Sequence, residues 1–402
     1  MPPSWRRTSA SSPARPTSAA TCSDMARAAV PRARPAPLGL LALALFVALG
    51  GCVERARLVP LPEPEAARET LAVFVGTSRR LDPERGFGKG RSGRLLLARY
   101  DISVPPMRAP GTLSWPHPGE APDPERDFLV ARAGLYPDAG GFRADLAREL
   151  RRRDPVEREA VIYVHGFNNS FDEALLRLAQ LAEDFALPAA AVHFSWPSAA
   201  SPFGYAYDRE SALYSRDALL QLIGEVEAAG ARRVILVGHS VGAMLVMEAL
   251  REMAIAAPGS PARRIAGVVL ISPDIDVELF RMQAHRIGRL PQPFGIFVSR
   301  RDRALQVSAA LTGQRDRLGN LRSVERIADL DVTLVDITAF TGDSVGHFVL
   351  GTSPALIRLF TRADAFDAAF RKDSAGNLGP AIGTILTVRN ASAIIVDPAA
   401  VN

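Results

Sequence analysis

Residues 232–243 read RRVILVGHSVGA, and this stretch decides the fold. The run Val234–Val237 has the apolar, β-branched composition of a buried strand, and a helical pattern begins just after it. Between them stands a G-x-S-x-G sequence centred on Ser240. On such a sharp turn Gly238 and Gly242 must be small, because the strand and the helix would otherwise collide. The stretch predicts a strained turn that lifts the Ser240 hydroxyl clear of the sheet. A glycine-rich turn with an incidental serine is the plainer alternative.

Apolar strands alternate with helices along residues 160–370. This alternation specifies an α/β fold with a mostly parallel sheet and helices on both faces. In such sheets, functional groups collect at the carboxyl ends of the strands. The expected strands are 71–75, 95–103, 160–164, 190–194, 234–237, 265–271, 294–298 and 332–337, and the expected helices are 142–153, 171–185, 210–229, 240–256 and 354–370.

A serine hydroxyl needs a neutral imidazole to take its proton and a carboxylate to orient that imidazole. Two histidines follow Ser240 in the chain, His285 and His347. His285 lies in an arginine-rich stretch that is typical of a solvated helix face. His347 follows a strand and a loop, at the place where a sheet presents functional groups. We therefore expect His347 to be the base, with an incidental loop histidine as the alternative.

The carboxylate is expected after a strand that follows the serine. Asp302 comes four residues after the 294–298 strand and gives the order Ser240, Asp302, His347, which is the order of α/β-hydrolases. Asp274 and Asp276, after the preceding strand, are its competitors. A helix N-cap is the alternative role for an aspartate at such a position.

An oxyanion hole needs two backbone N–H groups. The residue after the nucleophile, Val241, would supply one of them. The other is expected from the loop after the 160–164 strand, where His165-Gly166-Phe167 is similar to an H-G-x element, and we assign it to Phe167. A plain strand-to-helix turn is the alternative for this loop.

Several further short sequences fall at the expected strand ends and loops: VFVGTSR (73–79), VHGFNNSF (164–171), FSWPS (194–198), YxxD (205–208), GHSVGA (238–243), SRRDRAL (299–305) and GHF (346–348). Together they resemble a bacterial family of α/β-hydrolases of unknown function, grouped with esterases and lipases. The resemblance implies the α/β-hydrolase fold and a Ser240–Asp302–His347 triad. It also implies that Trp196 and Asp208 shape the site. His165, Gly166 and His239, which lie within the two turn sequences, are further candidates for shaping it.

The chain has 402 residues, of which 48% are hydrophobic and 23% charged, a globular composition. Its formal net charge of +5 arises within residues 1–51, which carry six arginines and one aspartate, so the rest of the chain nets zero. Residues 52–402 therefore have no excess of positive charge that would favour nucleic acid as a partner. No metal or organic cofactor is implied.

Residues 38–51 are uncharged and too few to span a membrane, which takes about 20 apolar residues. With the arginines before them they fit a signal peptide, for which Met25 is a candidate start. The sequence Leu49-Gly50-Gly51-Cys52 resembles a bacterial lipobox. The resemblance implies cleavage before Cys52, a lipid on its thiol and, since Val53 replaces the aspartate linked to inner-membrane retention, an outer-membrane anchor facing the periplasm in a source with two membranes. An ordinary cleaved signal or a short anchor is the alternative.

These features divide the chain into four parts. Residues 1–51 are the signal-peptide region, residues 52–69 an extended tether, residues 70–373 the α/β-hydrolase domain with its N-terminal strands, and residues 374–402 a C-terminal tail. Within the tail, residues 394–396 are suited to an edge strand.

We expect a serine hydrolase of carboxylic esters, anchored to the cell envelope, that acts on a small-molecule or lipid ester through an acyl-enzyme. An amidase or a thioesterase would use the same residues. A non-catalytic binding or scaffolding lipoprotein is the alternative from another class, because fold does not fix function. Neither the substrate nor the oligomeric state can be read from the sequence.

Overall fold

The computed structural model describes residues 55–63, 70–83, 86–153, 158–314, 316–340, 342, 345–361, 383–388 and 390–396. The predicted signal peptide, its candidate start at Met25 and the predicted lipidation site Cys52 lie outside the described residues. Within the described ranges, no helix has both the length and the apolar character that crossing a membrane requires.

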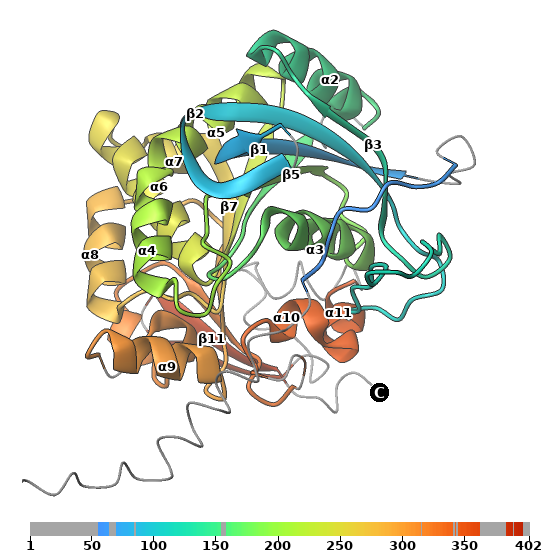
Figure 1. Ribbon diagram of the computed structural model, residues 1–402. Helices are drawn as coiled ribbons and strands as arrows, with labels where there is room; N and C mark the ends of the chain where they lie inside the picture. The colour runs from blue at the N-terminus through green and yellow to red at the C-terminus, as the bar shows by residue number, and fades with distance from the viewer. Residues whose placement is uncertain are drawn as a thin grey trace, which may run out of the picture. The chain divides into compact units, whose positions relative to one another are not determined.

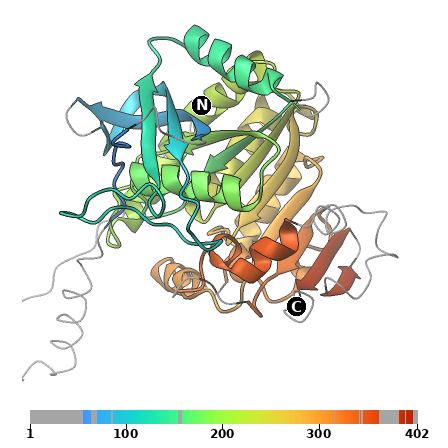
Figure 2. The ribbon, with the colours of Figure 1, turned by 90° about the vertical axis from the view of Figure 1, so that its right-hand side faces the viewer.

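The domain is built on one sheet, whose described strands follow the order β10-β11-β9-β8-β7-β6-β4-β5-β1-β2-β3. Neighbouring strands are parallel from β11 to β1, and antiparallel strands complete the two edges (Figure 2). The mostly parallel sheet confirms the predicted fold class. The strands are β1 (Thr70–Asp82), β2 (Gly86–Ser103), β3 (Leu129–Leu135), β4 (Glu159–Val164), β5 (Ala190–Ser195), β6 (Arg233–His239), β7 (Ile265–Ile271), β8 (Phe294–Val298), β9 (Thr333–Asp336), β10 (Gly383–Val388) and β11 (Ala391–Val396).

Helices cover both faces of the sheet, with α6 and α8 on one side and α3 and α11 on the other (Figure 1). Successive strand residues point to opposite faces, so Ile162 of β4 packs with the first group and Tyr163 with the second. The helices are α2 (Ala139–Arg151), α3 (Phe171–Asp184), α4 (Tyr205–Tyr214), α5 (Arg216–Ala228), α6 (Val241–Ala256), α7 (Ser260–Arg264), α8 (Val277–Ile287), α9 (Arg303–Leu311), α10 (Val349–Thr352) and α11 (Pro354–Phe360).

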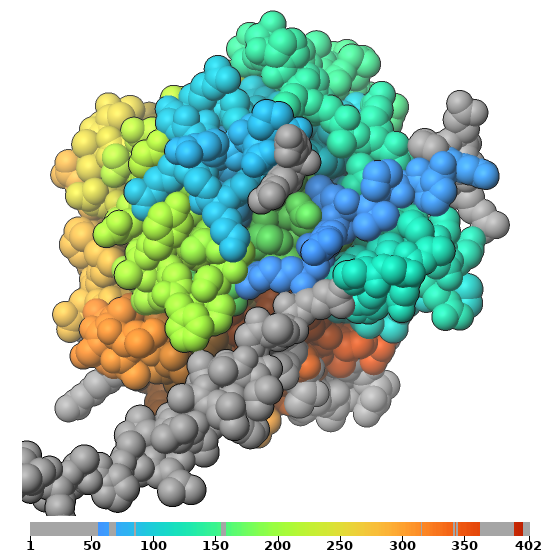
Figure 3. Space-filling model, in the orientation of Figure 1, coloured from blue at the N-terminus to red at the C-terminus, as the bar shows by residue number. Residues whose placement is uncertain are grey.

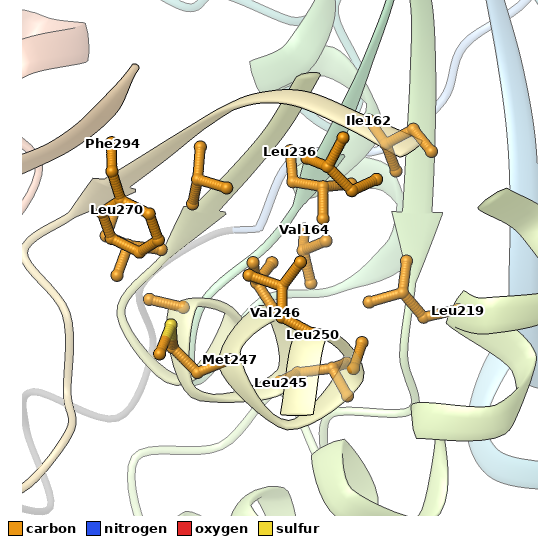
Figure 4. Close-up of a cluster of buried hydrophobic side chains, with 14 of the residues drawn as sticks. Ile162, Val164, Leu219, Leu236, Leu245, Val246, Met247, Leu250, Leu270 and Phe294 are labelled. Atoms are coloured by element: carbon orange, nitrogen blue, oxygen red, sulfur yellow. The ribbon is translucent and has the colours of Figure 1, made fainter. Parts of the chain in front are cut away.

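Helix α6, which follows the serine turn, is held in the middle of the core. Its side chains Val246 and Leu250 lie among those of Val164 and Leu236 from the sheet (Figure 4). A helix that is apolar on nearly all sides, as α6 is, is a buried helix. Each such side chain contributes roughly 1.5–3 kcal/mol by leaving water, so the turn at Ser240 sits between two firmly packed elements.

Several elements differ from the sequence prediction. The strand expected over 95–103 begins at Gly86, and β3 was not expected. The helix expected over 210–229 is divided into α4 and α5 at Ser215, whose hydroxyl donates to the Ser211 carbonyl oxygen at 2.7 Å. A serine that bonds back to the preceding turn in this way favours a bend. The closing helix expected over 354–370 ends at Phe360 as α11, and residues 362–370 lie outside the described residues.

The predicted C-terminal tail contributes two strands to the sheet. Strand β11 contains the expected edge strand 394–396, but it pairs in parallel with β9 and is covered in turn by β10. Both strands are therefore part of the same sheet as the strands before them. The pattern was hard to read because β10 and β11 form a short hairpin after a stretch without apolar periodicity.

The segment 55–63 belongs to the predicted tether but does not stand free of the domain. The Leu61 amide donates to the Val130 carbonyl oxygen at 2.8 Å, and the Val130 amide donates to the Val59 carbonyl oxygen at 2.9 Å. The side chains of Ala56 and Leu61 are buried. Figure 3 shows this segment, in blue, lying along the surface of the domain. The described part of the tether is therefore docked.

Candidate active site

Ser240 lies between β6 and α6 with φ 54° and ψ −120°. This is the left-handed half of backbone space, which a residue with a side chain enters at a cost of about 1–3 kcal/mol. A Cβ on Gly238 would lie 2.7 Å from the Ala243 Cα, and one on Gly242 would lie 2.3 Å from the Val164 and His165 carbonyl oxygens. The turn therefore requires glycine at both positions, for the steric reason that the sequence indicated.

The structure brings Asp302 and His347 together. The Nδ1 of His347 lies 2.7 Å from Oδ2 of Asp302, whose side chain is fully buried. The other carboxylate oxygen, Oδ1, accepts the Leu305 amide at 2.9 Å and caps α9. Gly346 has φ 67°, and a Cβ there would lie 3.3 Å from the Arg301 carbonyl oxygen. The glycine thus lets the histidine loop pass close to the aspartate loop.

The competing aspartates are engaged elsewhere. Asp276 caps α8 by accepting the Leu279 amide at 2.9 Å, the alternative role considered from the sequence. Asp274 is buried and its Oδ1 lies 3.0 Å from Nε of Arg317, while Oδ2 accepts the Tyr205 hydroxyl at 2.8 Å. The other downstream histidine, His285, lies on α8 with its side chain 57% exposed and its Nε2 3.0 Å from Asp329, as expected for a solvated face.

The loop after β4 abuts the serine. A Cβ on Gly166 would lie 2.9 Å from the Ser240 Cβ and 2.7 Å from Nδ1 of His239. Within the described ranges, neither the Phe167 amide nor the Val241 amide donates a hydrogen bond. Free N–H groups at a helix start and in an adjoining turn are what an oxyanion hole consists of. The loop 165–168 is called the oxyanion loop below.

Trp196 and His165 lock the first part of the oxyanion loop. The indole Nε1 donates to the His165 carbonyl oxygen at 2.8 Å, and the two rings stack with centroids 4.6 Å apart. Burial holds the pKa of His165 well below its usual value, with the Arg79 charge acting in the same direction. A neutral His165 can donate from Nδ1 to the Gly166 carbonyl oxygen, 2.9 Å away.

Asp208 locks the second part of the loop. Its Oδ2 accepts the Asn168 amide at 3.1 Å and the Ser198 hydroxyl at 2.6 Å. Burial raises the pKa of Asp208, and these hydrogen bonds and the Arg79 charge act against the rise. The resemblance implied that Trp196 and Asp208 shape the site, and both hold the backbone of the oxyanion loop.

His239 precedes the serine and lies beside His347, with ring centroids 4.9 Å apart. Burial lowers its pKa well below the usual value, and the neighbouring His347 charge lowers it further. The ring is therefore neutral around pH 7 and adds no charge that would compete with an imidazolium at His347. Within the described residues, no group of three or more His, Cys, Asp or Glu could hold a metal ion.

Comparison with known proteins identifies the family of this chain. The family described as "Alpha/beta hydrolase of unknown function (DUF900)" matches residues 139–363, more than half of the 402 residues. The chain belongs to this α/β-hydrolase family. The match includes Ser240, Asp302, His347 and the oxyanion loop, whereas β1 to β3 lie before it.

The solved structures that resemble this chain have low sequence identity to it and low TM-scores. A YdeN-like hydrolase from Pectobacterium atrosepticum is 18% identical, with 48% of this chain and 83% of that chain covered and a TM-score of 0.28. A hydrolase from Agrobacterium vitis is 14% identical, with 75% and 99% covered and a TM-score of 0.31. A lipase-esterase related protein from Clostridium acetobutylicum is 11% identical, with 61% and 88% covered and a TM-score of 0.26. No curated protein matches the chain.

For this α/β-hydrolase, one buried arginine beside the oxyanion loop was missed from the sequence. Arg79 at the carboxyl end of β1 is 1% exposed, and it donates to the Ser195 hydroxyl at 2.8 Å and to the Asn169 carbonyl oxygen at 3.0 Å. Burial lowers its pKa to about 10, so the guanidinium stays charged at pH 7. Its signal was a charged residue four positions after the apolar run 73–75, in VFVGTSR.

Proposed function

We propose that the protein is a serine hydrolase of carboxylic esters. The observation that carries the proposal is the 2.7 Å contact between His347 Nδ1 and Asp302 Oδ2, in a fold that holds Ser240 at a strained turn with φ 54°. The contact favours the tautomer in which Nδ1–H donates to the carboxylate. The Nε2 lone pair is then the one that can take the serine proton.

The reaction has two halves. Ser240 Oγ attacks the acyl carbon while His347 Nε2 takes its proton, and the amides of Phe167 and Val241 stabilise the oxyanion. Collapse expels the alcohol, which receives that proton from His347. Water then gives a proton to His347 and attacks the acyl-enzyme, and the proton returns to Ser240 Oγ as the carboxylic acid leaves. Asp302 orients the imidazole throughout.

We also propose that the enzyme is anchored to the cell envelope by a lipid on Cys52, in the outer membrane where the source has two. The Leu49-Gly50-Gly51-Cys52 sequence supports this, together with the run 38–51. Intact-protein mass spectrometry of the membrane fraction tests it. A mature protein that starts at Cys52 with the added mass of a diacylglyceryl group is expected, and one without that mass would contradict it.

Labelling by a fluorophosphonate probe tests the chemistry. We expect the wild-type protein to be labelled and to hydrolyse p-nitrophenyl butyrate. Ser240→Ala should abolish labelling, and His347→Ala should slow it. In both variants, kcat for ester hydrolysis should fall by about a thousandfold or more. Wild-type protein that is folded by circular dichroism yet unlabelled would favour the non-catalytic scaffold.

A matched set of substrates separates the related activities. The butyryl ester, the butyryl thioester and the butyryl anilide carry the same acyl group, so any difference arises at the leaving group. We expect the ester to give the highest kcat/KM. A higher value for the thioester or the anilide would assign the same residues to a thioesterase or an amidase.

A further inference from the structure

Tyr205, the first residue of α4, contacts the oxyanion loop through its ring. The ring meets that of Phe167 edge to face, with centroids 5.4 Å apart and an angle of 81° between the two planes. The next residue of the loop, Asn168, is held through its backbone, because its amide donates to Asp208 and its carbonyl oxygen accepts Arg55 Nη1 at 3.0 Å. Tyr205 instead contacts the side chain of Phe167, which is itself a proposed oxyanion donor.

The hydroxyl of Tyr205 enters a buried polar cluster. It donates to Asp274 Oδ2 at 2.8 Å, and the Ser308 hydroxyl donates to the other carboxylate oxygen, Oδ1, at 2.6 Å. The Tyr205 oxygen lies 2.7 Å from Ser308 Oγ and accepts Arg317 Nη2 at 3.3 Å. Asp274 is 2% exposed and Arg317 is 1% exposed, so neither charge can exchange these partners for water. These four residues are called the Tyr205 cluster below.

The Tyr205 cluster also contacts the other two parts of the proposed site. The Asp274 amide donates to the Ser240 carbonyl oxygen at 3.2 Å, at the serine turn. Ser308 lies on α9, the helix that Asp302 caps, and α4 and α9 lie next to each other in Figure 1. The cluster therefore joins the turn of the proposed nucleophile, the helix of the proposed acid and, through the ring of Tyr205, the oxyanion loop.

The direction of the Phe167 amide depends on how the peptide between Gly166 and Phe167 is held. The Gly166 carbonyl oxygen, on one side of this peptide, lies 2.9 Å from His165 Nδ1. On the other side, the ring of Phe167 lies against that of Tyr205. A hydrogen bond weakens steeply when the N–H turns away from its acceptor. A displacement of the Tyr205 ring would therefore weaken a hydrogen bond from this amide to an oxyanion.

We propose that Tyr205 is a positioning residue of the ester hydrolase, in which the Tyr205 cluster fixes the hydroxyl and the ring fixes the direction of the Phe167 amide. The inference rests on the proposed function. It assigns Asp274 the role of anchoring the Tyr205 hydroxyl, in place of the role of triad acid. Because the oxyanion forms only as the reaction proceeds, loss of this positioning affects the transition state more than the bound ester.

Substitutions at Tyr205 test the hydroxyl and the ring separately. Tyr205→Phe keeps the ring and removes the hydroxyl, whereas Tyr205→Leu removes both. On p-nitrophenyl butyrate we expect kcat to fall about five- to tenfold in Tyr205→Phe and about fiftyfold or more in Tyr205→Leu, with KM within twofold in both. Tyr214→Phe on the same helix is the matched control, because the Tyr214 hydroxyl makes no hydrogen bond in the described part of the chain. Equal kcat in Tyr205→Phe and Tyr214→Phe would overturn the proposal.

Two further measurements separate positioning from a loss of folded protein. Titration with a fluorophosphonate counts the competent sites, and kcat is then expressed per competent site. Propyl trifluoromethyl ketone carries the acyl chain of the butyryl ester. Ser240 Oγ adds to its carbonyl carbon and passes its proton to His347, which leaves a hemiketal oxyanion without a leaving group. We expect its Ki in Tyr205→Phe to rise by the factor by which kcat/KM falls. A wild-type Ki combined with a lowered kcat would overturn the proposal.

The link through the Tyr205 cluster to α9 is tested with Ser308→Ala, alone and combined with Tyr205→Phe. Two hydroxyls that act through one cluster have coupled effects. The kcat of the double variant should therefore lie within about twofold of that of the slower single variant. Losses that multiply would show that the two hydroxyls act independently and would overturn the link. A folded wild-type protein that hydrolyses no ester would contradict the proposed function itself, and an active wild type that Tyr205→Phe leaves unchanged would contradict only the inference.

Discussion

The Asp302 carboxylate serves His347 and the start of a helix at once. One oxygen lies 2.7 Å from Nδ1 of His347, and the other accepts the Leu305 amide at 2.9 Å. Two contacts on separate oxygens fix the plane of the carboxylate. The first turn of α9 therefore determines how the imidazole is oriented, so the cap and the proposed triad are one structure.

Because Asp302 has both roles, a substitution that keeps the helix cap but not the charge should change kcat without changing stability. Asp302→Asn retains a side chain that caps helices well, so the free energy of unfolding should change by less than about 1 kcal/mol. An amide next to Nδ1 favours the wrong imidazole tautomer, so kcat should fall by about a hundredfold to ten-thousandfold. Ester hydrolysis and urea unfolding measure the two effects. If this variant kept the wild-type kcat, the assignment of Asp302 as the carboxylate that orients His347 would be contradicted.

Asp274→Asn, in contrast to Asp302→Asn, should lower the free energy of unfolding. Arg317 is 1% exposed and would keep a buried charge without its ion-pair partner. Removal of one member of a buried pair costs about 3–5 kcal/mol, and urea unfolding should show this loss. The double variant Asp274→Asn/Arg317→Met should recover a part of it. If the single variant were as stable as the wild type, the ion pair would not contribute to the fold.

Gly242→Ala tests the steric requirement of the serine turn. The added Cβ would lie 2.3 Å from the carbonyl oxygens of Val164 and His165, so the end of β4 or the start of α6 must shift. We expect fluorophosphonate labelling to slow at least tenfold and the free energy of unfolding to fall by about 1–3 kcal/mol. Gly224→Ala on α5, where nothing lies within 4 Å of the new Cβ, should instead stabilise by about 0.5–1 kcal/mol. Equal labelling rates in the two variants would contradict the steric account.

Trp196→Phe isolates the hydrogen bond that holds the oxyanion loop. Phenylalanine keeps a ring against His165 but cannot donate to its carbonyl oxygen, which the indole reaches at 2.8 Å. We expect kcat on p-nitrophenyl butyrate to fall about five- to tenfold, the loss of roughly 1 kcal/mol. Trp115→Phe is the control, because Nε1 of Trp115 is buried with no hydrogen-bond partner in the described part of the chain. A loss in the control as large as in Trp196→Phe would rule out this role for the Trp196 hydrogen bond.

Buried histidines predict loss of stability in acid. Burial lowers the pKa of His193 from 6.5 to about 3, and His165 and His239 are lowered by the same cause. Between pH 6.5 and the lowered pKa of each histidine, the imidazole binds a proton in the unfolded chain but not in the folded chain. Each histidine then removes about 1.4 kcal/mol of stability per pH unit as the pH falls below 6.5. Above pH 6.5 the contribution is constant.

The change His193→Leu should flatten this dependence. Urea unfolding at pH 8 measures the packing effect of the substitution by itself, because the imidazole is neutral in both states there. From pH 6.5 to pH 4.5 the variant should lose less stability than the wild type, by about 1.4 kcal/mol per pH unit. Parallel curves for the two proteins would mean that His193 is not kept neutral by burial.

The role of a residue could be predicted from the sequence where that role depends on residues close to it in the chain. The glycines around Ser240 and the positions of Asp302 and His347 after strands could be predicted, because strand ends and sharp turns have local patterns. The mostly parallel α/β sheet followed from the alternation of strands and helices, and the α/β-hydrolase fold was implied by the resemblance of the short sequences to that family.

Contacts across long chain separations could not be predicted in this way. Arg55 and Asn168 are 113 residues apart, and nothing in a segment without periodicity indicates that its arginine is docked. Strand β3 was missed because only its first residues are buried, so its apolar pattern is weak. The means by which Asp208 and Trp196 act, through the backbone of the oxyanion loop, likewise required the fold.

The place of β11 in the sheet has a consequence for synthesis. Strand β11 covers the edge of β9, yet it is translated after every other parallel strand. A nascent chain that ends after α11 would contain every residue of the proposed chemistry and still present an unpaired edge at β9. Such edges are templates for aggregation. The solubility of the newly made protein is therefore decided by residues that take no part in catalysis.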